Sequence, residues 1–180
     1  MNEIAESSVC ESLLKRALKD PLAIYLLASI RKTGCLVRGG NIKCLKRDAE
    51  LSQVSGKFDP ETGIIIYEDE ILTRSQVEDT LRHELIHLFD YCRYKFDQAQ
   101  PRHVACSEVR AIALSGECRW IREFMRGNVY FWGLKGHFIK CIKRRALLSL
   151  SNRNTFDSER TMDEVFNTCI ADTSPFLDIP

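Results

Sequence analysis

The sequence His83-Glu84-Leu85-Ile86-His87 places two histidines four residues apart, in a stretch with the apolar periodicity of a helix. Residues at this spacing project from one helix face, so both imidazoles can reach the same metal ion. Glu84 follows the first histidine and can face a water molecule at that ion instead of the ion itself. The motif therefore predicts metal-assisted hydrolysis, with His83 and His87 as Zn²⁺ ligands and Glu84 as the catalytic base.

The residues around this motif predict a strand followed by an amphipathic helix. The β-branched run Gly63 to Tyr67 predicts the strand, and Ser75 to Tyr94 has the pattern of the helix. Ser75 and Glu78 have the spacing of a capping box at the helix start. The apolar stripe of this helix consists of Val77, Leu81, Leu85, Leu88 and Cys92. A strand before such a helix is typical of the zincin arrangement, in which the strand edge can align an extended peptide.

A catalytic zinc ion usually has a third protein ligand and one open position. Glu108 is the favoured third ligand, because it is the only charge on a small, apolar face of a second predicted helix, Val104 to Arg126. A carboxylate buried there needs a partner, and a metal ion would be one. His103, at the start of that helix, is the alternative ligand. Asp90 follows His87 by about one turn and is better placed to support the site than to bind the metal.

Length and charge narrow the class of protein. A chain of 180 residues most simply forms one domain, residues 1–180. A net charge of +1 gives no reason to expect direct nucleic-acid binding. The longest strongly apolar run, Leu22 to Ile30, is too short to span a bilayer. Met1 to Ser8 is acidic and polar, which predicts neither a secretory signal nor an Arg-rich transit peptide.

Eight cysteines are spread along the chain without a CxxC pair. Without paired ligand spacing, a structural zinc knuckle is not expected. An even number of dispersed cysteines is typical of disulfides in an oxidising compartment, and buried thiols in a reducing compartment are the alternative. If the cysteines are oxidised, Cys92 on the metal helix can bridge to Cys106 or Cys118 on the next helix.

The remaining pattern predicts an α+β fold, mainly helical, with a small sheet beside the HExxH helix. The other expected helices are Ser8 to Lys19, Pro21 to Gly34 with Asp20 as N-cap, His137 to Leu150 and Met162 to Ile170. Cys35 to Pro60 is expected to form short strands and turns, and Phe96 to Arg102 a loop. The sequence context of His137 gives no support for a role at the metal.

The sequence resembles the mitochondrial ATP synthase-processing and assembly metalloproteases, a family that is also known for a Ku-binding protein in animals. The resemblance covers nearly the whole chain. It is carried by the HExxH motif with Phe89-Asp90, by His103 to Ala111, by Leu114 to Cys118 and by Asp163 to Phe166. Both Glu108 and His103 belong to the matching segment, so the resemblance leaves the third ligand open.

The resemblance implies a zincin-like zinc metalloendopeptidase on the intermembrane-space side of the mitochondrial inner membrane, attached peripherally. It implies that the enzyme processes the precursor of ATP synthase subunit 6 and, as a chaperone, binds assembly intermediates of the Fo sector. It also favours oxidised cysteines, because import into that compartment uses a disulfide relay. The alternative is a non-catalytic assembly chaperone, or a Ku-binding DNA-repair adaptor with a zincin fold. The intact HExxH motif favours the peptidase, because an adaptor has no physical need for Glu84 beside the two histidines.

Overall fold

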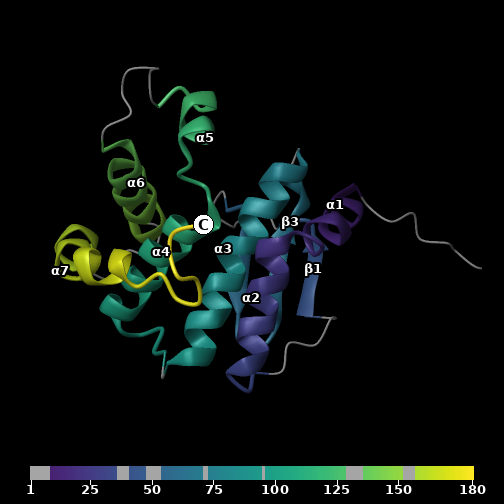
Figure 1. Ribbon diagram of the computed structural model, residues 1–180, viewed down its shortest axis with the longest axis horizontal. Coiled ribbons are helices and arrows are strands. Elements are labelled where there is room, and N and C mark those ends of the chain that lie inside the picture. Colours follow the sequence, from purple (N-terminus) through teal and green to yellow (C-terminus); the bar gives the residue numbers. More distant parts are fainter. Residues whose placement is uncertain are drawn as a thin grey trace, which may run out of the picture. The chain divides into compact units, whose positions relative to one another are not determined.

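The structure is a computed structural model that describes residues 9–35, 41–47, 54–70, 73–94, 96–128, 136–151 and 157–180. The chain divides into two compact units, residues 1–88 and 89–180, and helix α3 (Arg74–Arg93) runs from the first into the second (Figure 1). The predicted α+β class, mainly helical with a small sheet, is confirmed. The expectation for Met1 to Ser8 lies outside the described residues. The interpretation of residues 1–180 as one domain stays a prediction.

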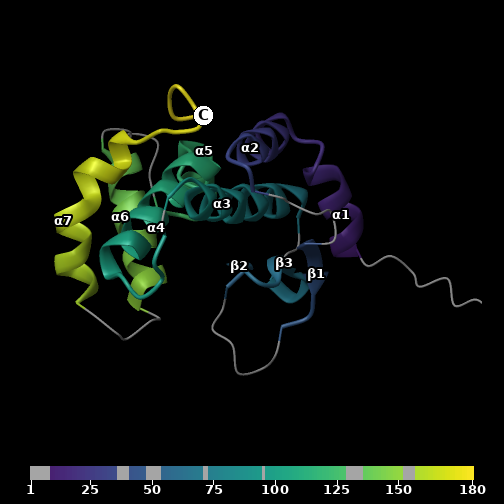
Figure 2. The same ribbon diagram turned by 90° about the horizontal axis from the view of Figure 1, so that it is seen from below.

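The first unit combines helices with a three-stranded sheet. Its helices before α3 are α1 (Val9–Ala17) and α2 (Pro21–Lys32), and its strands are β1 (Ile42–Leu45), β2 (Gly56–Asp59) and β3 (Gly63–Tyr67), the last followed by the 3₁₀ turn η2 (Glu68–Glu70). Within this unit α2 and the sheet lie on opposite sides of α3 (Figure 2). The predicted N-cap is confirmed, because the Asp20 carboxylate accepts hydrogen bonds from the backbone N–H groups of Leu22 and Ala23, both at 3.1 Å.

The predicted strand at Gly63 to Tyr67 is confirmed as β3, but it is the central strand of the sheet. It pairs with β1 in parallel and with β2 in antiparallel orientation. The hairpin to β2 forms because the Asp59 carboxylate accepts hydrogen bonds from the N–H groups of Glu61 and Thr62, at 3.0 and 2.9 Å. The expectation that the strand before the HExxH helix offers its own edge to a peptide is therefore wrong. In the described sheet β1 and β2 are the edge strands.

Helix α3 begins one residue before the predicted start, and its capping box differs from the predicted one. The Oε1 of Gln76 accepts a hydrogen bond from the Thr73 N–H at 2.8 Å, and the Thr73 hydroxyl accepts one from the Gln76 N–H at 3.3 Å. This reciprocal pair is the capping box, so the assignment to Ser75 and Glu78 is wrong. Glu78 instead lies inside the helix and pairs with Arg74 at 2.7 Å.

The second unit is helical in the part of the chain that the structure describes. It contains the end of α3 and the helices α4 (Pro101–Ser115), α5 (Trp120–Met125), α6 (His137–Ser151) and α7 (Ser158–Ala171), with α4 packed against α6 and α7 (Figure 1). The prediction of a single helix over Val104 to Arg126 is wrong, because α4 ends at Ser115 and has Gly116 as its C-cap. That residue has φ +91°, a left-handed conformation that terminates α4 before α5 begins. None of the described helices is both long and apolar enough to cross a bilayer.

All eight cysteines lie in the described residues, and all are disulfide-bonded, as the oxidised interpretation predicts. Three bridges are Cys10–Cys44, Cys106–Cys169 and Cys118–Cys141. The expected bridge from Cys92 to Cys106 or Cys118 is wrong, because both of those cysteines pair with residues of later helices. The Cys106–Cys169 bridge joins α4 to α7. The Cys118–Cys141 bridge joins the turn before α5 to α6. Both bridges thus hold the helices of the second unit together.

Candidate active site

Helix α3 presents the two histidines of the motif side by side. The Nε2 atoms of His83 and His87 are 3.0 Å apart, and both side chains are half-buried. Their ring centroids are 4.7 Å apart, with the rings edge to face. The buried apolar residues of α3, among them Leu81, Leu85 and Phe89, occupy other positions around the helix. One metal ion can contact both Nε2 atoms at this separation, because zinc–imidazole bonds are about 2.0–2.1 Å long.

Glu84 lies on the part of α3 that faces strand β2. Its side chain is buried, and a Cβ atom added to Gly56 of β2 would lie 3.1 Å from its Oε1 atom. The same added atom would lie 2.6 Å from Cγ2 of Thr80 on the preceding turn of α3. Glycine at this position is therefore what allows the β2 backbone to approach the Glu84 carboxylate closely. The carboxylate is thus held between helix α3 and the edge strand β2, on the residue that directly follows His83.

Glu108 joins the two histidines in one set of potential metal ligands. Each of the three residues offers one ligand atom, and these atoms all lie within 4.8 Å of one another. Glu108 is buried on α4, two residues before Arg110. Two imidazole nitrogens and one carboxylate oxygen are the ligand set of one class of catalytic zinc site, so these residues fit a zinc ion. It is the one such set in the part of the chain that the structure describes.

His103, the alternative ligand, lies outside this set. Its side chain is exposed near the start of α4, and its Nδ1 atom accepts a hydrogen bond from the Asp97 N–H at 3.2 Å. Its ring lies 6.1 Å from that of Phe96. His137 opens α6 and is also not part of the set. The geometry thus favours Glu108 over His103 as the third ligand.

Asp90 pairs with an arginine and is not one of the three potential metal ligands. Its buried carboxylate accepts hydrogen bonds from Nε of Arg110 at 3.0 and 3.1 Å. Burial raises the pKa of Asp90, and the charge and hydrogen bonds of Arg110 oppose that rise. Because Asp90 is on α3 and Arg110 is on α4, the pair fastens the end of the HExxH helix to the helix that carries Glu108. This agrees with a supporting role for Asp90.

Arg110 is a residue that our sequence reasoning did not identify. Its side chain is fully buried, and it also donates hydrogen bonds to the backbone carbonyls of Asp172 and Ser174, the latter at 2.5 Å. The Asp172 carboxylate lies 2.9 Å from Arg110 and 2.5 Å from Arg93. Burial raises the pKa of Asp172, but the hydrogen bond from Arg93 and the charge of Arg110 outweigh it and lower the pKa below its ordinary value. The sequence signal that could have identified Arg110 is a basic residue among the small apolar residues of α4.

Comparisons with known proteins give the family of the chain. Residues 8–177 match the Peptidase M76 family, so the chain belongs to that family of peptidases. It is 38% identical to the "Mitochondrial inner membrane protease atp23" of Emericella nidulans, over 99% of this chain and 75% of the relative. It is 37% identical to the protein of the same name from Schizosaccharomyces pombe, over 95% of this chain and 92% of the relative. No solved structure matches the chain significantly.

Proposed function

We propose that this protein is a zinc-dependent endopeptidase with a zincin-like arrangement, in which His83, His87 and Glu108 hold the metal ion. The observation that carries the proposal is the set of three ligand atoms within 4.8 Å of one another. The buried Glu84 directly follows the first of these ligands in the sequence. The membership in the Peptidase M76 family supports the reaction class. A zinc ion bound there would acidify water and polarise a peptide carbonyl.

The protein's own residues supply the proton transfer and the alignment of the substrate. Glu84 takes the proton of the attacking water and delivers it to the amine that leaves. Strand β2 is an edge strand whose backbone approaches Glu84 at Gly56, so an extended peptide that pairs with β2 would pass beside this base. In this proposal the edge that aligns the peptide belongs to β2, the antiparallel neighbour of β3, and not to β3 itself.

The proposed location is the mitochondrial inner membrane, with peripheral attachment on the intermembrane-space side. The names of the relatives support a location at the mitochondrial inner membrane. The fully oxidised cysteines are typical of an oxidising compartment. The proposed substrate is the precursor of ATP synthase subunit 6, with assembly intermediates of the Fo sector as further partners. The family resemblance supports these two assignments, and direct binding to nucleic acid is not proposed.

The deciding experiment separates metal binding, cleavage and assembly. We expect about one zinc per purified chain, retained in Glu84→Gln and lost in His83→Ala/His87→Ala. Glu84→Gln should abolish precursor cleavage, and Glu159→Gln, which changes an exposed acid on α7, should leave it intact. Equal zinc in wild type and the double histidine variant would contradict the peptidase proposal. Full cleavage by Glu84→Gln would remove the general base from the mechanism. Unchanged complex assembly in a cell that carries only Glu84→Gln would show that a chaperone role is separate from the chemistry.

A further inference from the structure

Helix α5 presents large apolar side chains on its outer face. Ile121, Phe124 and Met125 are exposed, with exposed fractions of 46%, 45% and 74%. The ring of Phe124 stacks on that of Trp120, with centroids 5.2 Å apart. A helix of six residues has little stability of its own, so its position depends on the contacts that hold it.

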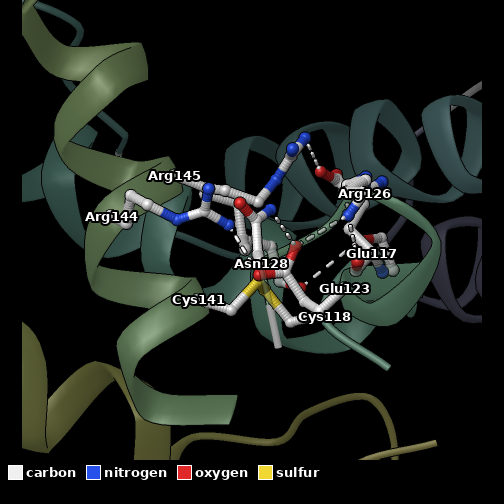
Figure 3. Close-up of a disulfide and its surroundings, with 10 residues drawn as sticks. Glu117, Cys118, Glu123, Arg126, Asn128, Cys141, Arg144 and Arg145 are labelled. Atoms are coloured by element: carbon white, nitrogen blue, oxygen red, sulfur yellow. Dashed lines mark hydrogen bonds and ion pairs between the residues drawn. A yellow bond between two sulfur atoms is a disulfide. The ribbon is translucent and has the colours of Figure 1, made fainter. Parts of the chain in front are cut away.

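A disulfide and a buried carboxylate connect this short helix to α6. The buried disulfide Cys118–Cys141 ties the residue two before α5 to helix α6. On α5 itself the buried Glu123 carboxylate accepts hydrogen bonds from Arg126 at 3.2 Å, from Asn128 at 3.3 Å and from Arg144 of α6 at 2.6 Å. Figure 3 shows these side chains gathered around the disulfide.

The second buried acid of this region is also neutralised internally. The Glu117 carboxylate pairs with Arg145 of α6 and accepts a hydrogen bond from the Ser115 hydroxyl at 3.2 Å. Arg126 donates a hydrogen bond to the Glu117 carbonyl at 2.7 Å. Figure 3 shows Glu117 and Glu123 turned toward the arginines of α6. The apolar residues Ile121, Phe124 and Met125 of α5 remain exposed. An arrangement that fixes an exposed apolar face is expected for a docking surface, because burial of that face in a partner repays its exposure.

The charge around α5 indicates the kind of partner. The sequence has no acidic residue between Glu123 and Asp157. The buried acids Glu117 and Glu123 are already paired with Arg145, Arg126 and Arg144. Two further basic residues, Arg119 and Lys140, are exposed. Arg119 directly follows Cys118, and Lys140 directly precedes Cys141. Because these cysteines are bonded to each other just before α5, both basic residues lie near that helix. Exposed apolar and aromatic side chains with basic residues around them are typical of contact with an anionic lipid surface.

We propose that the outer face of α5, formed by Ile121, Phe124 and Met125 with the surrounding basic residues, docks this protein on an anionic bilayer. Three exposed apolar side chains are few for a stable protein interface, which usually takes about 20–30 residues from each side. They suffice for shallow insertion when basic residues add electrostatic attraction. The inference rests on the membrane location in the proposed function but not on the metal chemistry, so each can fail without the other.

The experiment is co-sedimentation of the intact, oxidised protein with vesicles of 70% phosphatidylcholine and 30% cardiolipin. We expect binding that weakens in 1 M NaCl and is much lower with vesicles of phosphatidylcholine alone. Phe124→Ser/Met125→Ser should lower the partition coefficient at least about tenfold. Val9→Ser/Ile24→Ser is the matched control, because Val9 and Ile24 are 77% and 53% exposed on α1 and α2. This control should bind within about twofold of wild type.

A second variant tests the charge, and two readouts check the fold. Arg119→Gln/Lys140→Gln should lower binding to the anionic vesicles about tenfold, because each basic residue near such a surface contributes to the attraction. Zinc content and melting temperature should match wild type in both variants. Equal vesicle binding by wild type and Phe124→Ser/Met125→Ser, or no binding by wild type, would overturn the proposal. Equal binding of the wild-type protein to neutral and anionic vesicles would also overturn it. If Phe124→Ser/Met125→Ser bound vesicles like wild type but lost a complex with another protein, the face would be a docking surface for that protein instead.

Discussion

Asp90 and Arg110 form a buried ion pair, 3.0 Å from carboxylate oxygen to Nε, that joins the last turn of the HExxH helix to helix α4. Arg110 holds the segment after α7 as well, through the carbonyls of Asp172 and Ser174. Three parts of the second unit that are distant in sequence therefore meet at one guanidinium group.

Arg110→Met is predicted to destabilise the protein by about 3–5 kcal/mol, because the buried Asp90 carboxylate loses the guanidinium that donates to both of its oxygens. Asp90→Leu/Arg110→Met should recover part of that loss, since no buried charge then remains at this position. Denaturant unfolding of the metal-free proteins measures both. A cost below about 1 kcal/mol for the single variant would show that Asp90 gains little from this pair.

Glu108→Ala is predicted to lower zinc affinity at least about tenfold, since even residues that only support metal ligands usually contribute that much. His103→Ala is predicted to affect turnover more than metal affinity, because its exposed ring lies outside the ligand set. Zinc titration against a competing chelator measures both affinities. If His103→Ala lost more metal than Glu108→Ala, His103 would be the ligand and Glu108 a supporting residue.

Gly56→Ala is predicted to lower turnover about tenfold or more while zinc content stays unchanged. The added Cβ would lie 2.6 Å from Cγ2 of Thr80 and 3.1 Å from Oε1 of Glu84, so β2 or the base must move. Thr80→Ser removes the methyl group at the shorter contact, and Gly56→Ala/Thr80→Ser should recover part of the activity. Wild-type turnover by Gly56→Ala would mean that the distance between β2 and Glu84 is unimportant for the reaction.

Asp20→Asn is predicted to destabilise the protein at neutral pH by about 2 kcal/mol. The variant keeps an N-cap for α2 but loses the charge pair with Arg82, whose Nη2 and Nε lie 2.8 and 2.9 Å from the carboxylate. Burial raises the pKa of Asp20, but the hydrogen bonds and charge of Arg82 and the cap N–H groups lower it below 3.8.

A lowered pKa in the folded state defines the pH at which this contribution disappears. It is fully present above the unfolded value of 3.8 and is lost as pH falls through the lower folded value. The difference in unfolding free energy between wild type and Asp20→Asn should therefore be constant from pH 7 to about 5 and shrink below about 4. Denaturant unfolding in the presence of EDTA tests this without a contribution from the metal. A difference that grew on acidification would contradict the assigned sign.

Cys118→Ala/Cys141→Ala is predicted to cost about 3 kcal/mol, because the bridge closes a loop between residues 23 apart in sequence. Thiol counting under denaturing, non-reducing conditions should find none of the eight cysteines free in the wild-type protein. Seven or eight free thiols in protein from its native compartment would favour the cytosolic or nuclear adaptor interpretation.

The features that the sequence by itself determined are those that depend on residues within about one helical turn of each other. The HExxH helix, the β3 strand and the Asp20 cap follow from local periodicity and from side chains that bond to nearby backbone groups. Local rules also failed where two candidates competed. Thr73 with Gln76 and Ser75 with Glu78 both have capping spacing, and only the structure shows that the helix uses the first pair.

The tertiary structure decided the contacts between residues that are distant in sequence. Arg110 meets Asp172 across 62 residues, Cys106 bonds to Cys169 across 63, and β3 is central because a hairpin adds β2 to one side of it. The partner of a buried charge or a cysteine depends on the path of the whole chain, and no periodicity in a short window contains that path. The cost of leaving a buried charge unpaired then makes the arrangement that the fold permits the stable one.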